Sequence, residues 1–374
     1  MPEPAVHPRS PDAGRRPVPG RRGPRPIRAA ALAGPVLALT LGAAPPAGAE
    51  EPATPSTRCQ VGDPRLAELS GLVDVGDRML AMVDGGDQVT VYVLDGTCQV
   101  VDVVTAPLDP YDPEDLAVGA DGTVWLADTG DNNATRATVA LLALRPDGTT
   151  ALYRMTYPDG PHDAEALLLA PDGTPYVVTK EVLGASHVYR PATALVDGGT
   201  VGLADVGTVT FTLTGTPGGP VGRAGQLLVT GGAVARDGSR IALRTYTDAY
   251  VWPLAGADVP GALAGEPVRV ALPGAPQGEA VSFTADGSAL LVAGEGVPGD
   301  VTLVPVPAAT APSSTAPPAD PSLPGLLSDG SGGVPPVTAG LVAAAVATAL
   351  VWIGGRLLRR RPAAGDAPGP PRNG

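Results

Sequence analysis

The stretch EDLAVGADGTVWLA, residues 114–127, decides the fold. Two short runs rich in Leu, Val and Ala flank the pair Asp121-Gly122, and a D-G pair between such runs is typical of an antiparallel hairpin. The same order of opening run, D-G pair and second apolar run returns around Asp172-Gly173, Asp237-Gly238 and Asp286-Gly287. No long stretch of this region has the 3.6-residue period of an amphipathic helix. The sequence therefore predicts an all-β domain.

The runs that open these repeats can be aligned with one another. They are Ser70-Gly71-Leu72-Val73, Glu114-Asp115-Leu116-Ala117-Val118, Glu165-Ala166-Leu167-Leu168, Gly232-Ala233-Val234 and Glu279-Ala280-Val281. Repeats of about 40–50 residues with about four strands each are typical of propeller blades. We expect a five- or six-bladed β-propeller, because the longest interval, between Glu165 and Gly232, has room for part of a sixth blade. A β-sandwich is the alternative, but it does not explain the repeated openings.

The N-terminus has the pattern of an export signal. Arginines crowd residues 15–28, an apolar run covers residues 29–44, and the small residues Ala47-Gly48-Ala49 precede Glu50. A basic segment, a short apolar segment and an A-x-A site form the secretory signature. We expect residues 1–49 to be a signal peptide and residues 50–308 to be an extracytoplasmic domain.

The C-terminus has the pattern of a membrane anchor. Residues 309–336 are rich in Pro, Ser and Gly and predict a stalk. Residues 337–358 are uncharged until Arg356 and long enough to cross a hydrocarbon layer of about 30 Å. The arginine-rich tail, residues 359–374, predicts a cytoplasmic C-terminus. We expect a single-pass protein of the cell membrane with its β domain outside the cell.

The chain contains two cysteines, Cys59 and Cys98, and both lie in the domain that we expect to be exported. Export favours a disulfide between them, and the alternative is a pair of buried free thiols. The last repeat has three obvious strands, so a strand near Cys59 is expected to close the ring. A disulfide would then lock this closure.

The charge of the domain restricts its partners. Residues 50–308 contain 33 Asp and Glu against 12 Arg and 1 Lys, which gives a net charge near −20. A domain this acidic repels phosphate backbones and anionic lipids, so we expect no nucleic-acid partner. Cations and cationic ligands are better candidates.

Equivalent acidic positions predict a site. Glu114, Glu165 and Glu279 occupy the same place in three repeats and are expected to converge at one mouth of the central channel. Carboxylates in one cleft raise one another's pKa unless a cation neutralises them, and calcium prefers such oxygen ligands. The residues that we expect at the mouth are Glu114, Asp115, Asp163, Glu165, Lys180, Arg244, Glu279 and Glu295.

Two further sets of residues leave alternatives open. Asp128, Asp131 and Asn132, on a turn that contains glycine, are candidate calcium ligands; alternatively, the acids bond backbone N–H groups at strand ends. Lys180, with Arg136 and Arg244, either faces an anionic ligand above the channel or forms ion pairs with adjacent acids.

Four motifs carry a resemblance. Asp112-Pro113-Glu114-Asp115-Leu116-Ala117, Asp128-Thr129-Gly130-Asp131-Asn132-Asn133 with Arg136, Tyr157-Pro158-Asp159-Gly160 with Asp163-Ala164-Glu165-Ala166-Leu167, and Gln277-Gly278-Glu279-Ala280 resemble a group of actinobacterial exported propellers. That group is distantly similar to phytase-like and gluconolactonase-like propellers of the WD40 or NHL type. The resemblance, over residues 66–296, implies a propeller outside the cytoplasm and no particular activity.

Signatures of covalent catalysis are absent from the sequence. It contains no G-x-S-x-G, H-E-x-x-H or P-loop motif, and His162 and His187 are isolated. We therefore expect a module that binds an extracellular ligand or partner, without catalysis. The alternative is a calcium-dependent hydrolase of phosphate esters or lactones that uses a carboxylate-lined channel mouth.

Overall fold

The computed structural model describes residues 54–306. Almost all of the regular structure consists of strands. The exceptions are two short 3-10 helices, η1 (Pro64–Leu66) and η2 (Gly222–Gln226), and one short helix, α1 (Val259–Leu263). The prediction of an all-β domain is confirmed.

The strands form groups of four in which each strand pairs antiparallel with the next. The first group is β2 (Leu69–Asp74), β3 (Met79–Val83), β4 (Val89–Leu94) and β5 (Val100–Ala106). The second is β6 (Pro113–Val118), β7 (Val124–Asp128), β8 (Val139–Leu144) and β9 (Thr150–Thr156). The third is β10 (Ala164–Leu169), β11 (Pro175–Thr179), β12 (Ala185–Pro191) and β13 (Thr200–Thr210). The fourth is β14 (Val229–Val234), β15 (Arg240–Thr245), β16 (Asp248–Pro253) and β17 (Val268–Ala271).

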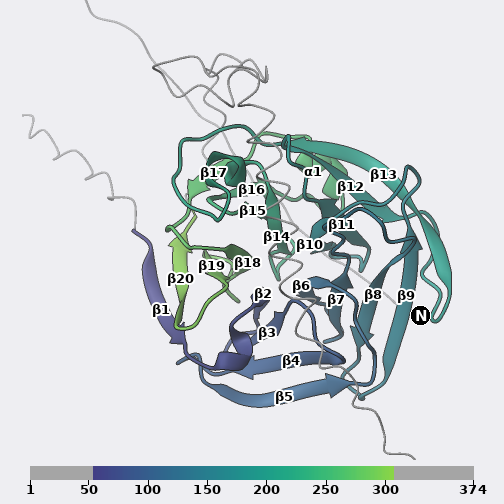
Figure 1. Cartoon of the computed structure of the whole chain (residues 1–374), viewed down its shortest axis with the longest axis horizontal. Helices are drawn as coiled ribbons and strands as arrows, with labels where there is room; N and C mark the ends of the chain where they lie inside the picture. Colours follow the sequence, from purple (N-terminus) through teal and green to yellow (C-terminus); the bar gives the residue numbers. More distant parts are fainter. Residues whose placement is uncertain (1–53, 307–374) are drawn as a thin grey trace, which may run out of the picture. The chain divides into compact units, whose positions relative to one another are not determined.

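The remaining sheet joins the two ends of the described chain. It contains β18 (Gly278–Phe283), β19 (Ala289–Gly294), β20 (Gly299–Pro305) and, beyond β20, the first strand β1 (Ser56–Val61). The first strands of the groups, β2, β6, β10, β14 and β18, contact one another in this order, and β18 contacts β2 again. Figure 1 shows these strands toward the middle and β5, β9, β13 and β1 toward the outside. This is a propeller arrangement.

A disulfide fixes the strand that completes the last sheet. Cys59 of β1 is bonded to Cys98, in the turn between β4 and β5. The guanidinium of Arg58 also forms an ion pair with Asp74 of β2 at 2.9 Å. The predicted disulfide and the predicted closing strand are therefore confirmed. A second link joins the neighbouring second and third groups, because β13 pairs in parallel with β9 from Thr200 to Gly202.

The apolar core lies between neighbouring groups. Every residue of β8 and β10 is buried, because each of these strands is covered on both faces. Between the first and second groups, Met82, Leu116 and Leu126 form one cluster with neighbouring Val and Leu side chains. Each fully buried side chain of this kind stabilises the fold by about 1.5–3 kcal/mol.

The predicted signal peptide, stalk, membrane helix and cytoplasmic tail lie outside the described residues, and so do residues 50–53 and 307–308 of the predicted domain. Within residues 54–306, no helix has the length and the hydropathy needed to cross a bilayer.

Candidate functional site

The first strand of every group contains an irregularity near its start. The register shifts next to Ser70, Glu114, Glu165 and Thr230, and again between Gly278 and Val281, where Glu279 lies. A bulge of this kind turns a side chain out of the normal alternation of a strand. The fourth repeat was predicted to align at Gly232, and the structure places Thr230, two residues earlier, at the equivalent position.

The second strands end at the same side of the ring. The backbone N–H groups of Asp84, Gly130, Lys180 and Glu295 donate to the carbonyls of Glu68, Asp112, Asp163 and Gln277, respectively. We call this side, where the first strands begin and the second strands end, the mouth. Repetition of one backbone pattern therefore places side chains from different groups at one end of the inner strands.

Three carboxylates from two groups meet at the mouth. Glu114, Asp163 and Glu165 each offer an oxygen, and these oxygens all lie within 4.8 Å of one another. Only 6% of Glu114 and 3% of Glu165 is exposed. Gly130 provides the space, because a Cβ atom there would collide with the carboxylates of Glu114 and Asp112. We call these three residues the triad.

Lys180 supplies positive charge to the triad. Its Nζ donates a hydrogen bond of 2.5 Å to Glu165 Oε1 and lies 5.2 Å from the centre of the Tyr246 ring. Although burial lowers it, the nearby Glu165, Tyr246 and Glu279 together raise the pKa of Lys180 well above its ordinary value. Lys180 is the only lysine in the chain. The site thus contains a permanent ammonium that balances one carboxylate.

The remaining negative charge at the triad is not balanced. Burial, and then the carboxylates of Glu165 and Asp112, raise the pKa of Glu114 well above its ordinary value. Burial, together with Asp163 and Glu279, likewise raises the pKa of Glu165 despite Lys180. Burial and the charge of Asp163 raise the pKa of Asp112 to about 6. A bound cation would offset both the cost of burying these charges and the repulsion between them.

Glu279 approaches the same region from the fifth group. The residue is 5% exposed, and its Oε2 is buried without a hydrogen-bond partner among the described residues. Burial raises its pKa, whereas Lys180 and Arg244 oppose the shift. The side chain of Gln277, two residues earlier, donates to Glu295. The structure therefore brings the three predicted glutamates to one end of the ring, with Glu114 and Glu165 in direct proximity.

Asp115, which we predicted at the mouth, lies between the inner strands instead of in an open cleft. Its carboxylate accepts hydrogen bonds from the backbone N–H groups of Leu116, Leu167 and Gly232, at 2.8–3.0 Å. It is 1% exposed, and burial raises its pKa to about 8 although the three N–H groups favour the charged form. Its contacts are those of a structural link between three groups.

Arg244 is also buried among backbone groups. One of its guanidinium nitrogens donates to the carbonyls of Ala280 and Ala293, both at 2.6 Å, so the side chain links the fourth group to the fifth. Burial lowers its pKa to about 10. Its bonds to these carbonyls leave Lys180 as the better-placed cation for a ligand at the triad.

The turn that holds Asp128, Asp131 and Asn132 bonds largely to itself. Asp128 forms an ion pair of 3.0 Å with Arg136, and Asp131 accepts from the backbone N–H groups of Thr135 and Arg136. Asn132 is exposed. The carboxylates that lie within metal-binding range of one another are instead those of the triad.

The two described histidines form a separate cluster beside the mouth. His162 lies 3.4 Å from Glu181 and 3.2 Å from Asp159, and its ring centre is 5.8 Å from that of His187. His187 pairs with Asp205 at 3.0 Å. These contacts tie the loop that carries Asp163 to the loop that carries Lys180.

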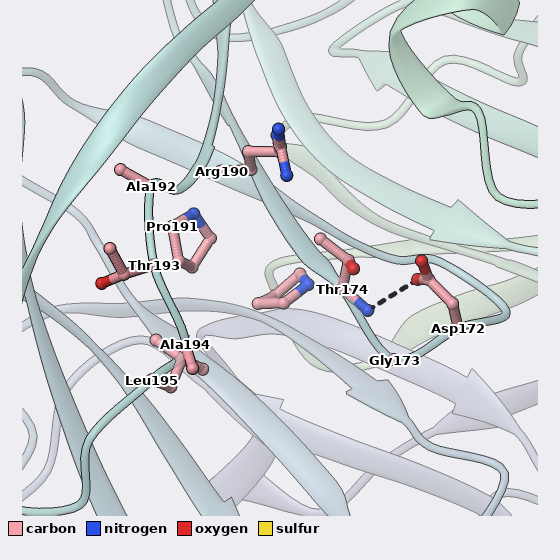
Figure 2. A pocket seen from close by; sticks show the side chains of 10 residues that line it. Asp172, Gly173, Thr174, Arg190, Pro191, Ala192, Thr193, Ala194 and Leu195 are labelled. Atoms are coloured by element: carbon pink, nitrogen blue, oxygen red, sulfur yellow. Dashed lines mark hydrogen bonds between the residues drawn. The ribbon is translucent and has the colours of Figure 1, made fainter.

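A surface pocket lies away from the triad. Asp172, Thr174 and Arg190 line it with neighbouring residues of the β10–β11 turn and of the segment after β12 (Figure 2). These residues lie at the opposite ends of β10 and β11 from Glu165 and Lys180. The pocket therefore has no part in the acidic mouth.

Several residues at the mouth were not predicted from the sequence. They are Glu68, Asp84, Asp112, Gly130 and Tyr246. A signal was present for two of them, because Asp112 precedes Glu114, and Glu68 precedes Ser70, by the two residues that separate Asp163 from Glu165. Nothing in the sequence around Asp84 or Gly130 indicates that the second strands end at the same place.

Comparisons with known proteins add little to this geometry. No protein-family model matches the chain, and no curated protein matches its sequence. A gluconolactonase from Xanthomonas campestris is 19% identical over 64% of this chain and 73% of its own, with a TM-score of 0.38. A virginiamycin B lyase from Staphylococcus aureus is 11% identical over 68% of this chain and 74% of its own, with a TM-score of 0.34.

A third solved structure, the PQQ-bound aldose sugar dehydrogenase from Streptomyces coelicolor, is 12% identical over 68% of this chain and 99% of its own, with a TM-score of 0.36. The gluconolactonase among these structures agrees with the resemblance noted from the sequence. At such scores none of them carries an argument about the site. The fold rests on the strand pairings described above.

Proposed function

We propose that this protein is a five-bladed propeller that binds a divalent cation, calcium, at the triad and acts as an extracytoplasmic ligand-binding module. The observation that carries the proposal is the approach of three carboxylates, two of them buried and one half-buried, to within 4.8 Å of one another. Each group of four strands corresponds to one blade, and β1 supplies the outermost strand of the fifth.

The charge of the site fits a divalent ion. Ionised Glu114, Asp163 and Glu165 carry three negative charges, and Lys180 returns one positive charge, so the net charge of −2 matches a divalent cation. The ligands are all carboxylate oxygens, which calcium and magnesium prefer to zinc or copper. Calcium accepts six to eight oxygens in flexible geometry, so water and the bound ligand would complete its shell.

The path of the chain favours a mouth that points away from any anchor. Ser56 at the start of β1 pairs with Leu303, near the end of β20, whereas Val61 pairs with Gly299. Gly299 follows Glu295 and so lies at the mouth, and the chain enters and leaves the fold at the other end. If residues 337–358 cross the cell membrane as we propose, the triad would face the surroundings of the cell.

A calcium-dependent hydrolase of phosphate esters or lactones is the second candidate. It is favoured by buried acids beside the triad whose pKa values lie near neutrality. Burial and the carboxylates of Glu68 and Asp112 raise the pKa of Asp84 to about 7. An acid of this kind beside a bound cation suits general acid–base catalysis. A panel of phosphate esters and lactones, assayed with and without calcium, separates this function from binding alone.

Thermal melting of the full-length chain tests the cation site. A ligand that binds only the folded state at 100 times its Kd stabilises it by about 2.7 kcal/mol. We expect calcium to raise Tm relative to chelator, and Asp163→Asn to abolish the increase. Asp87→Asn is the control, because Asp87 is an exposed acid on the loop after β3 at the same end of the fold. An equal calcium effect in both variants would remove Asp163 from the site.

A further inference from the structure

A second group of carboxylates lies at the mouth. Glu68 and Asp84 come from the first group of strands, and Glu279 and Glu295 come from the fifth. The N–H of Gly296, next to Glu295, donates to the carbonyl of Ala67, next to Glu68, so the two groups meet here. Burial, followed by the charges of Glu279, Asp84 and Glu68, raises the pKa of Glu295 to about 8. We call these four residues the tetrad. It is separate from the triad, which is built on the second and third groups.

Two oxygens of the tetrad lack donors. Asp84 Oδ1 and Glu279 Oε2 are buried and accept no hydrogen bond from the described residues. An ionised carboxylate oxygen left without a donor in a buried place is costly, so such atoms mark the position of a missing partner. Only 5% of Glu279 is exposed. Its negative charge contributes to the raised pKa values of Glu295, Asp84 and Glu165. Its free oxygen therefore belongs to the mouth.

The cations around the tetrad are already engaged. Lys180 is bonded to Glu165, and Arg244 donates to backbone carbonyls. Within residues 54–306, no ion pair involves Glu68, Asp84, Glu279 or Glu295. The nearest fixed partner of a tetrad carboxylate is the neutral amide of Gln277, which donates to Glu295. Lys180 and Arg244 attract Glu279 through space, but among the described residues neither forms an ion pair with a carboxylate of the tetrad.

The spacing of the tetrad differs from that of the triad. The oxygens of the triad all lie within 4.8 Å of one another. Among the described residues, no three carboxylates of the tetrad come as close together. A single bare metal ion needs ligand oxygens that converge on one point. A guanidinium instead spreads five N–H donors over a planar fork, and an ammonium presents three. Separated carboxylates with free oxygens suit these larger cations.

We propose that the tetrad binds the guanidinium of an organic ligand, with Asp84 Oδ1 and Glu279 Oε2 as acceptors. The inference deepens the proposed function, since it gives the chemical class of the ligand that the mouth receives beside the metal. Charge-assisted hydrogen bonds of this kind are about twice as strong as neutral ones and select by geometry. The ligand is thus a basic compound or a basic side chain of a peptide.

Calorimetric titration of the full-length chain tests the inference with two matched probes. L-Argininamide carries the guanidinium, and L-citrullinamide has the same shape with a neutral urea in its place. We expect argininamide to bind in calcium buffer and citrullinamide to bind at least about tenfold more weakly. Equal binding of the two probes, or binding of neither, overturns the proposal. The peptide Gly-Arg-Gly and agmatine then show whether the source is a peptide or a free amine.

Variants locate the site. Asp84→Asn and Glu279→Gln are each expected to weaken argininamide at least about tenfold, whereas Asp87→Asn leaves it unchanged. Unchanged binding of argininamide in both tetrad variants overturns the proposal. It is also overturned if Asp84→Asn binds one calcium ion fewer than the unmodified chain and the unmodified chain does not bind argininamide. If the melting curve of a variant shows that it does not fold, the proposal is judged by the binding of the two probes to the unmodified chain. Asp163→Asn separates the two sites, because it removes calcium from the triad and leaves the guanidinium contacts of the tetrad.

Discussion

The carboxylate of Asp115 accepts a hydrogen bond of 3.0 Å from the backbone N–H of Gly232, which lies 117 residues further along the chain. The same oxygen accepts one of 2.8 Å from Leu167. One side chain of the second group thereby satisfies backbone donors of the third and fourth groups. This buried acid links the inner strands of three groups, and these are the strands that carry the residues of the mouth.

Asp115→Ala is expected to destabilise the protein strongly. The substitution leaves the buried N–H groups of Leu167 and Gly232 without acceptors, and each unsatisfied group costs about 1–3 kcal/mol. We expect a loss of at least about 3 kcal/mol in the free energy of unfolding, measured by denaturant titration. The matched change Asp121→Ala, at an exposed turn on the other side of the same group, should cost much less. Similar losses in the two variants would contradict the role of Asp115.

Gly130→Ala is expected to disturb the triad without unfolding the protein. A Cβ atom at this position would collide with the carboxylates of Glu114 and Asp112, so Glu114 must turn away. We expect the calcium-dependent rise in Tm to fall by half or more. Gly62→Ala is the control, because a Cβ atom there meets nothing within 4 Å. An unaltered calcium response in Gly130→Ala would show that Glu114 is not a ligand.

The stability of the calcium-free protein is expected to fall as pH rises from about 4 to 8. The pKa values of Asp84 and Glu295 are raised to about 7 and 8, so the folded state holds these protons more tightly than the unfolded state does. Above the unfolded pKa of about 4, each pH unit therefore costs up to about 1.4 kcal/mol per group until the folded pKa is reached.

Denaturant titrations at several pH values in chelator measure this slope. The double variant Asp84→Asn, Glu295→Gln should make it shallower, because the two neutral amides no longer titrate, whereas Asp112 and Asp115, whose pKa values are also raised, still do. A slope that is the same in the double variant and in the unmodified chain would mean that other groups dominate the pH dependence.

Removal of the disulfide is expected to weaken the closure of the ring. Cys59 and Cys98 are separated by 39 residues, and a cross-link over a loop of this length stabilises a protein by about 3–4 kcal/mol in the chain-entropy treatment. We expect the double variant Cys59→Ser, Cys98→Ser to lose this amount and to match the reduced protein. Because Arg58 still pairs with Asp74, the ring should remain folded at room temperature. Equal stability of the oxidised and the reduced protein would show that the disulfide does not stabilise the closure of the ring.

Much of the fold could be predicted from the sequence because strands and turns have local signals. The D-G pairs and the repeated openings located the inner strands of four groups, and the three-stranded last repeat pointed to β1 as its missing partner. The fourth opening was placed two residues late at Gly232. Its bulge carries Thr230, which lacks the acidic side chain that guided the alignment elsewhere.

Less of the site could be predicted, because it depends on which backbone groups meet across the ring. Glu114 and Glu165 were found because they share a repeat position. Asp115 stands next to Glu114 in the sequence but turns inward to strands of other groups, and a one-residue step decides this direction. Asp84 lies in the first repeat, where Ser70 replaces the glutamate, so no acidic motif drew attention to it.

The central claim is that Glu114, Asp163 and Glu165 hold one divalent cation. Equilibrium dialysis of the full-length chain against radioactive calcium measures the number of bound ions directly. We predict one triad-dependent ion per chain, lost in Glu165→Gln and retained in Asp87→Asn. Calcium binding that is the same in both variants, or no binding to the unmodified chain, would contradict the account.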